Sequence, residues 1–346
     1  MDQSNIILSS AQEISTAAED FYRDYWQPQQ QSVSPLRSMI EQRQHFIIHT
    51  LMTHTGVYGR VIELGVGGEG GIISALRTSA NVCGLDISDS AIEGCRNLGI
   101  PAIKLNCDNT PLPFENDCID TVIALEVFEH FSNPQFVLEE IRRVLKPDGL
   151  FIASTPSPYT YHWPRLFYPD LFTQTGFTDF LLANRFQCKL HTDPFCQNCY
   201  KKEQHHSTVE TSFSLYWQAA KIADHDLYSL HSAAQELFNR RDSQGRRIRP
   251  IEALDLLKRC MQIDASSLSL QTDYLCALFY RAINNDTKEF YEQIGNLMQH
   301  TFNGESPMKY AQALLQIHHE AEELGRRFLD DGILHTLISF SCHDRH

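Results

Sequence analysis

A glycine-rich turn with an acidic residue beside it is the first feature of this chain that could do chemistry. Residues 61–76 read VIELGVGGEGGIISAL, and Gly65, Gly67 and Gly70 satisfy the spacing G-x-G-x-x-G. Glycines at this spacing allow a ligand to approach the backbone closely, and the pattern is typical of turns that hold the pyrophosphate of a dinucleotide. Taken alone, this turn could serve a nicotinamide or a flavin cofactor.

Glu63, two residues before the first glycine, points to a different cofactor. In a dinucleotide-binding fold this position normally faces the sheet interior and is apolar. A carboxylate there would repel the doubly negative pyrophosphate, whereas it would attract a cofactor that carries an ammonium and a sulfonium group. Glu63 therefore favours S-adenosylmethionine over NAD.

Two further acidic residues follow the next two predicted strands. Asp86 ends the strand in VCGLDIS, where a carboxylate can accept hydrogen bonds from both hydroxyls of a ribose. Asp108 stands in CDNTPLPF at the end of the third strand, where it can meet the amino group of an adenine. A ribose contact suits either cofactor, so Asp86 alone does not discriminate between them.

The elements that must position these residues alternate between strands and helices. Five short β-rich apolar runs, VIEL, VCGLDI, AIKLNC, TVIAL and LFIAS, are separated by helical patterns such as NPQFVLEEIRRVL. Asn133 is a suitable N-cap for that helix, Pro134 suits its first turn, and residues 147–149 (PDG) are expected to stop it. This alternation predicts an α/β fold with a doubly wound, parallel sheet.

Five linked motifs give the chain a family resemblance. They are ELGVG, LDIS, CDNTPLPF, IDTVIALEVFEHFSNP and EIRRVLKPDGLFIASTP, and they occur in this order within residues 61–156. This segment resembles the class I S-adenosylmethionine-dependent methyltransferases, especially the subgroup of ubiquinone-pathway and small-molecule enzymes. The family usually reads E-x-G-x-G-x-G, but here Glu69 takes the third glycine position between Gly68 and Gly70, which leaves the register of the turn open.

The resemblance implies a fold and a set of cofactor contacts. The fold is a seven-stranded Rossmann-like sheet, with a helix in PDLFTQTGFTDFLLANRF, strand six in FQCKLHTDPF and an antiparallel strand seven in FSLYWQAAKI. The residues implied to contact the cofactor are Glu63, Gly65, Gly67, Asp86, Ile87, Asp108, Asn109, Leu125 and Glu126.

These patterns divide the chain into three predicted parts. Residues 1–35 form an N-terminal arm, 36–223 the methyltransferase domain, and 224–346 an all-α, repeat-like domain outside the resemblance. Helical patterns in this last part include IEALDLLKRCMQI, SLQTDYLCALFYRAI and KEFYEQIGNLMQ. The arm contains the aromatic cluster FYRDYW (21–26), which is either a lid over cofactor and acceptor or a helix packed on the sheet edge. The charged run RRDSQGRRIRP (240–250) is expected to be a solvated linker, with a site for an anionic acceptor as the alternative. The helical domain could bind a protein partner, dimerise or cap the substrate pocket.

Methyl transfer needs a base only when the acceptor loses a proton during attack. His130, after strand four, and His162, after strand five, are the candidates, because an unperturbed imidazole titrates near neutrality. Glu129 and His130 could instead only hold their loop by hydrogen bonds. Tyr159, Tyr161 and Arg165 are expected to line the substrate pocket together with Tyr22 of the arm.

Residues 188–206 contain side chains that could bind a metal ion. Cys196 and Cys199 form a C-x-x-C pair with further cysteine and histidine residues nearby, which are suitable zinc ligands. A second C-x-x-C at the usual spacing is missing, which favours a polar loop with two free thiols. We therefore predict no bound metal.

Composition excludes several classes of protein. The net charge of −14 and the pI of about 5.5 argue against a nonspecific binder of nucleic acid or of an anionic membrane. The sequence has no recognisable signal peptide and no run of 18 apolar residues. Its ten cysteines are expected to be reduced, and a cytoplasmic location follows as the expectation.

The residues and the resemblance together predict a methyltransferase that uses S-adenosylmethionine. Its expected acceptor is the oxygen, nitrogen or carbon of a small or carrier-linked metabolite. Three alternatives stay open: a protein methyltransferase whose helical domain docks the target, a non-catalytic adaptor that retains the fold, and a nicotinamide oxidoreductase.

Overall fold

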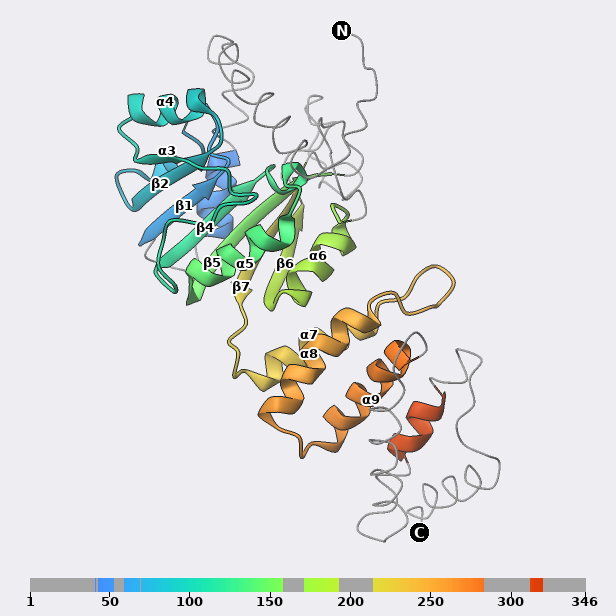
Figure 1. The fold of residues 1–346 in the computed structure, drawn as a ribbon. Coiled ribbons are helices and arrows are strands. Elements are labelled where there is room, and N and C mark those ends of the chain that lie inside the picture. The colour runs from blue at the N-terminus through green and yellow to red at the C-terminus, as the bar shows by residue number, and fades with distance from the viewer. Residues whose placement is uncertain are drawn as a thin grey trace. The chain divides into compact units, whose positions relative to one another are not determined.

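The computed structural model describes residues 41, 43–52, 59–68, 70–157, 171–192, 214–282 and 312–319. The chain divides into two compact units, Met1–Lys221 and Ile222–His346. Figure 1 shows a sheet flanked by helices in the first unit and a group of helices in the second. The sequence analysis placed this boundary two residues later, at 223.

The first unit is built on one seven-stranded sheet, as predicted. Its strands are ordered β3-β2-β1-β4-β5-β7-β6, and β7 runs antiparallel to both β5 and β6 while the other neighbours that pair are parallel. The direction of winding reverses between β1 and β4, where an open α/β sheet forms its ligand crevice. The strands are β1 (Arg60–Leu64), β2 (Asn81–Asp86), β3 (Ala102–Lys104), β4 (Ile119–Leu125), β5 (Leu145–Pro156), β6 (Phe186–Thr192) and β7 (Ser214–Lys221).

Helices cover both faces of this sheet. One buried cluster joins α5 (Pro134–Val144) and α6 (Gln174–Ala183) to the strands through side chains such as Ile141, Phe177 and Trp217. The other cluster joins η2 (Ile47–Leu51), α3 (Ile73–Leu76) and α4 (Asp89–Asn97) to the opposite face. Both faces of the sheet are therefore buried, which explains why the central strands are continuous apolar runs and do not alternate between apolar and polar residues.

The helix boundaries follow from local capping, with two differences from the prediction. Asn133 caps α5 through a bond from the amide of Phe136, but the helix ends at Val144, because Leu145 already pairs with Ile119 of β4. The helix predicted over 169–186 is shorter, because Thr173 accepts a hydrogen bond from the amide of Gly176 and so caps α6 at residue 174.

The described part of the second unit is helical. It contains α7 (Leu227–Phe238), α8 (Pro250–Ile263), α9 (Leu268–Ala282) and a helix over 312–319. The patterns IEALDLLKRCMQI and SLQTDYLCALFYRAI correspond to α8 and α9, whereas α7 was not singled out in the sequence. The helix predicted in KEFYEQIGNLMQ lies outside the described residues.

The arginine-rich run 240–250 is a solvent-exposed connection between α7 and α8 with an ordered turn. Arg241 and Arg247 pair across it as an antiparallel bridge, and Asp242 Oδ1 accepts bonds from the amides of Gln244 and Arg246. The guanidinium of Arg247 lies 3.9 Å from the ring centre of Phe238. These contacts are local, and none of residues 240–250 is buried, so the connection is solvent-exposed as predicted while keeping an ordered turn.

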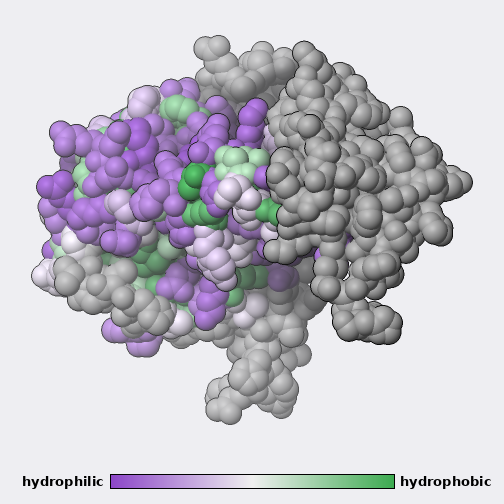
Figure 2. Space-filling view, turned by 90° about the horizontal axis from the view of Figure 1, so that it is seen from below, coloured by the Kyte–Doolittle hydropathy of each residue, from purple (hydrophilic) through white to green (hydrophobic). Residues whose placement is uncertain are grey.

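Hydrophilic side chains cover most of the described surface on the face shown in Figure 2, and hydrophobic ones form small patches. The large hydrophobic residues with the greatest exposure include Tyr228, at 85 %. Among the described residues, no helix is long and apolar enough to cross a membrane.

Candidate cofactor-binding site

The glycine turn after β1 adopts a backbone that only glycine takes easily. Gly65 and Gly67 both have φ of 68°, in the left-handed region. The amide of Gly65 donates to the carbonyl of Leu85 at 2.8 Å, which folds the turn back over the end of β2. A Cβ at Gly65 would lie 2.8 Å from Cγ2 of Val127. The segments that directly follow β1 and β4, here called the β1 and β4 outlets, therefore lie against each other at this point.

The later glycines of the turn face protein rather than open space. A Cβ at Gly70 would lie 2.8 Å from Leu98 Cδ1 and 3.1 Å from Ile100 Cδ1, and one at Gly71 would collide with the carboxylate of Glu63. Gly70 therefore packs toward apolar side chains next to α4 and β3. Glu69 lies outside the described residues.

Glu63 is buried beneath this turn. Its side chain is directed at the start of α3, where the amide of Ile73 donates to Oε2 at 3.1 Å. Burial raises the pKa of Glu63 to about 8, and the backbone bonds and the nearby Arg43 only partly oppose this rise. The carboxyl group is consequently mostly protonated at neutral pH, and an adjacent cation would favour its ionised form.

Asp86 connects the end of β2 to the glycine turn. Its Oδ2 accepts a hydrogen bond from the amide of Gly67 at 3.0 Å, and its Oδ1 accepts one from the amide of Ser88 at 2.8 Å. Burial raises the pKa of this carboxyl group, while the two backbone donors lower it. Ile87, the next predicted contact, is half-buried.

Asp108 lies four residues beyond β3 and anchors the segment that follows η3 (Phe128–His130). Its Oδ2 accepts bonds from the amide of Ser132 at 2.9 Å and from the hydroxyl of the same residue, and its Oδ1 accepts one from the amide of Asn133 at 2.8 Å. Both oxygens thus already have protein donors. Asn109 is exposed beside it and accepts a bond from the hydroxyl of Thr110. The adenine contact of Asp108 stays a prediction.

Glu126 marks the outlet of β4, directly after Leu125. Its φ of 52° is uncommon for a residue with a side chain and costs on the order of 1 kcal/mol. Ser154 of β5 holds it in place: the amide of Glu126 donates to the carbonyl of Ser154 at 3.0 Å, and the Ser154 hydroxyl donates to Glu126 Oε1, also at 3.0 Å.

Arg43 is a member of this site that the sequence analysis missed. Its Nη2 lies 3.2 Å from Glu126 Oε1, and its Nε donates to the hydroxyl of Tyr216 at 2.8 Å. It belongs to a helical segment over residues 43–51 that lies before the family motifs. No sequence signal pointed to it, because only the fold brings residue 43 beside residues 126, 154 and 216.

Glu129 and His130 form the short helix η3 after this outlet. Glu129 is 1 % exposed and its Oε1 lies 3.7 Å from Nε2 of His130, whose side chain is 12 % exposed. The imidazole is therefore placed beside a buried carboxylate at the carboxyl edge of the sheet. This arrangement can orient a base or hold the loop, as the sequence analysis proposed.

Several predicted site residues lie outside the described part of the chain. They are Tyr22, Tyr159, Tyr161, His162, Arg165, Cys196 and Cys199. Among the residues that are described, no three histidine, cysteine, aspartate or glutamate side chains gather closely enough to hold a metal ion.

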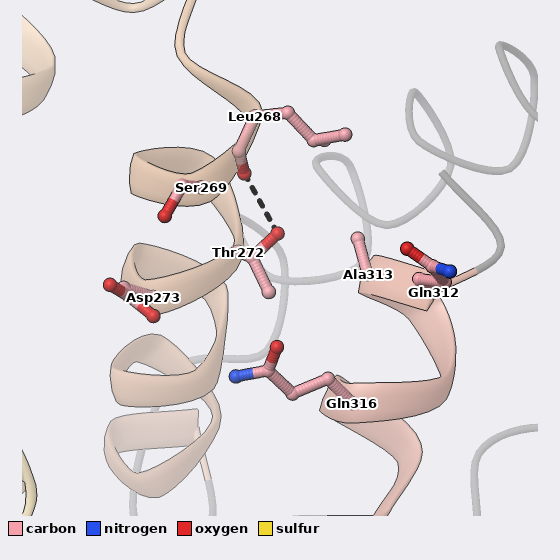
Figure 3. A pocket seen from close by; sticks show the side chains of 7 residues that line it. All are labelled: Leu268, Ser269, Thr272, Asp273, Gln312, Ala313 and Gln316. Atoms are coloured by element: carbon pink, nitrogen blue, oxygen red, sulfur yellow. Dashed lines mark hydrogen bonds between the residues drawn. The ribbon is translucent and has the colours of Figure 1, made fainter. Parts of the chain in front are cut away.

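A separate hollow of about 270 Å³ occurs within the helical unit (Figure 3). Figure 3 shows Gln316 directed toward α9, whereas Asp273 lies on the other side of that helix. Thr272 donates its hydroxyl to the carbonyl of Leu268, and Asp273 Oδ2 lies 2.7 Å from Nε2 of His231. Both groups are thus engaged within the protein. The lining residues are Leu268, Ser269, Thr272, Asp273, Gln312, Ala313 and Gln316.

The acidic side chains and the glycine turn at the carboxyl ends of the strands fit a cofactor that carries positive charge and an adenosyl group. The glycine turn exposes backbone atoms that glycine side chains do not cover. Glu63 is the second-last residue of β1, Asp86 is the last residue of β2, and Glu126 directly follows β4. In their ionised form, carboxyl groups in this arrangement attract an ammonium and a sulfonium and repel a pyrophosphate. The contacts of Glu63 with the methionine end and of Asp86 with the ribose stay predictions.

Comparison with known proteins identifies the domain. Residues 62–153 match the family model described as a methyltransferase domain. This part of the chain is a class I S-adenosylmethionine-dependent methyltransferase domain, whose cofactor is S-adenosylmethionine.

Curated relatives match over about one third of the chain. A probable S-adenosylmethionine-dependent methyltransferase of Mycolicibacterium smegmatis is 28 % identical over 120 residues, which are 34 % of this chain and 46 % of the relative. The sterol 24-C-methyltransferase erg6 of Schizosaccharomyces pombe is 32 % identical over 123 residues, 32 % of this chain and 31 % of that protein. A ubiquinone biosynthesis O-methyltransferase of Maricaulis maris is 26 % identical over 151 residues, 38 % of this chain and 56 % of the relative. The matches thus span about half, or less, of these relatives.

Solved structures resemble the fold. A 1,6-didemethyltoxoflavin-N1-methyltransferase of Burkholderia thailandensis, with its substrate and S-adenosylhomocysteine bound, aligns with a TM-score of 0.47 at 15 % identity, covering 64 % of this chain and 94 % of that one. An S-adenosylmethionine-dependent methyltransferase of Archaeoglobus fulgidus aligns with a TM-score of 0.42 at 16 % identity, over 52 % of this chain and 94 % of its own.

Proposed function

We propose that this protein transfers a methyl group from S-adenosylmethionine to the oxygen, nitrogen or carbon of a small or carrier-linked metabolite. The observation that carries the proposal is the buried carboxyl group of Glu63 beneath a bare glycine turn, with Asp86 bonded to the amide of Gly67 beside it. Relatives of this domain include enzymes named for sterol, for phthiotriol and phenolphthiotriol dimycocerosates, and for ubiquinone biosynthesis.

The bound cofactor would supply a methyl group activated by its sulfonium, which an acceptor displaces in line. The protein's own contribution is orientation and a site that excludes water. Asp86 would hold the ribose, and the ionised form of Glu63 would balance the positive charge of the methionine end. At the β4 outlet, His130 would take a proton from the acceptor, and the carboxyl group of Glu129, 3.7 Å from its Nε2, would orient the ring.

Cofactor binding is the first test. Calorimetry on the full chain should detect S-adenosylmethionine and no NAD. Asp86→Asn should weaken this binding at least tenfold, because a carboxylate that accepts hydrogen bonds from both ribose hydroxyls is replaced by an uncharged amide, which is a weaker hydrogen-bond acceptor. The matched control is Asp89→Asn, which changes a carboxylate in α4 that is 68 % exposed and pairs with Lys104. Binding of NAD in place of S-adenosylmethionine would overturn the proposal, and binding of neither would favour the adaptor.

The acceptor class is tested by transfer of a labelled methyl group. The protein is incubated with methyl-labelled S-adenosylmethionine and with separated metabolite and protein fractions of a cell extract. Label in the metabolite fraction that depends on Asp86 supports a small or carrier-linked acceptor. Label confined to polypeptides other than carriers would replace that acceptor with a protein target, while leaving the cofactor assignment intact.

A further inference from the structure

The pairing of Arg43 with Glu126 raises a question about charge. Glu126 stands at the β4 outlet next to Val127, whose side chain touches Gly65 of the glycine turn. A lone carboxylate at this crevice would attract the sulfonium of the cofactor strongly. Instead, the guanidinium of Arg43 lies 3.2 Å from Glu126 Oε1 and compensates its charge.

Arg43 is held in this position from several strands. Its Nε donates to the hydroxyl of Tyr216 at 2.8 Å, and its guanidinium lies 5.5 Å from the centre of the Tyr216 ring. Its Nη2 also contacts the hydroxyls of Ser154 and Ser214, each at 3.4 Å. These contacts fix the orientation of the guanidinium, and the side chain is still 30 % exposed at the crevice.

The neighbouring residue ties the same helical segment to the glycine turn. Gln44 Nε2 donates to the carbonyl of Gly71 at 3.1 Å and to the hydroxyl of Ser74 at 3.2 Å. At the other end of the segment, the carbonyl of Leu51 accepts a bond from Gln218 of β7. Two consecutive side chains, Arg43 and Gln44, therefore bridge the β4 outlet and the glycine turn, which are the two sides of the crevice.

We propose that Arg43 is a positioning residue that orients Glu126 and neutralises its charge, and that it thereby sets how strongly the site prefers cationic S-adenosylmethionine over neutral S-adenosylhomocysteine. This inference rests on the proposed function. Methyl transfer converts the sulfonium of the cofactor into a thioether, so substrate and product differ at sulfur by one positive charge. Each uncompensated carboxylate near that sulfur increases the affinity ratio of substrate to product, and Arg43 limits this ratio.

The test measures the dissociation constants of both compounds by calorimetry on the full chain. Arg43→Met should raise the ratio of S-adenosylmethionine affinity to S-adenosylhomocysteine affinity by roughly threefold to tenfold, because the charge of Glu126 is no longer compensated. Glu126→Gln should lower the ratio, since Arg43 then repels the sulfonium. The double variant should return close to the parent ratio. Arg43→Lys should keep the parent ratio because it retains the charge.

The control variant Arg96→Met removes an exposed arginine of α4 and should leave the ratio unchanged. Equal losses of affinity for both compounds in Arg43→Met, with the ratio constant, would overturn the inference and show a purely structural role. If Arg43→Met does not fold, the affinity ratio is measured in the other two variants, where Glu126→Gln should lower it and Arg43→Lys should keep it. An unchanged ratio in Glu126→Gln would then overturn the inference. Failure of the parent protein to bind either compound would count against the proposed function, and is distinguishable from an unchanged ratio.

Discussion

The amide of Ile73 donates a hydrogen bond of 3.1 Å to Oε2 of Glu63, and this bond fixes a carboxyl group in the interior beneath the glycine turn. The same carboxyl group fills the space that a side chain at Gly71 would need. Because desolvation outweighs the backbone donors, the pKa of Glu63 is raised to about 8 in the folded protein. Two predictions follow from this position, one for stability and one for binding.

Stability of the cofactor-free protein should fall as pH rises. The folded state keeps the Glu63 proton up to about pH 8, whereas the unfolded state loses it near pH 4.5. The free energy of unfolding should therefore decrease by several kcal/mol between these values. Urea titrations at pH 5.5 and pH 8.5 measure the change, and Glu63→Gln should reduce it. An identical pH dependence in both proteins would contradict the buried, protonated carboxyl group.

Cofactor affinity should have the opposite pH dependence. A cationic cofactor favours ionised Glu63, so binding must release its proton below pH 8, and S-adenosylmethionine affinity should increase from pH 6 to pH 8. Glu63→Gln should bind the cofactor more weakly and lose most of this increase, although it stabilises the cofactor-free protein at pH 8. Calorimetry in buffers of different ionisation enthalpy checks the proton release. Equal affinity in parent and variant would show that Glu63 serves folding only.

Gly65 should tolerate no side chain. In Gly65→Ala the new Cβ meets Val127 Cγ2 at 2.8 Å and is also strained at φ of 68°. Gly99→Ala is the matched control, because its φ is 70° but nothing lies within 4 Å of a Cβ there. Gly99→Ala should cost about 1 kcal/mol from strain alone, and Gly65→Ala clearly more, with loss of cofactor binding. Similar melting temperatures and similar affinities for the two variants would refute the close approach of the β1 and β4 outlets.

Asp108→Asn should destabilise the domain. The amide group of asparagine would face at least one of the donors from Ser132 and Asn133, which now share both oxygens of Asp108. The cost should be about 1–3 kcal/mol in the free energy of unfolding, and hydrogen exchange should increase at residues 130–133. Asp89→Asn serves again as the exposed control. A variant that loses cofactor affinity with unchanged stability would show that Asp108 acts on the adenine rather than on this segment.

His130→Gln tests the base. If the imidazole beside Glu129 accepts the acceptor's proton, the maximal rate of methyl transfer should fall by about two orders of magnitude or more while the cofactor dissociation constant stays the same. Transfer of labelled methyl to the acceptor fraction measures the rate, and calorimetry measures the dissociation constant. A normal rate would leave Glu129 and His130 with the role of holding the loop.

The sequence by itself determined the fold and the nature of the cofactor. Strand-helix alternation predicted the sheet, and a capping residue such as Asn133 acts within a few positions of the chain, which is why the local pattern indicates it. Glu63 and Asp86 could be proposed as site residues from the sequence, because a ligand crevice forms where strands end and so collects residues at the end of each β run.

Only the tertiary structure decided what those side chains contact. The ion pair of Arg43 and Glu126 joins residues 83 positions apart, and the bonds of Asp108 to the segment after η3 span 24 and 25 positions. The physical reason is that pairing and desolvation depend on distance in space: the acidity of Glu63 was fixed by its burial, and burial exists only once the sheet and the turn have closed around it.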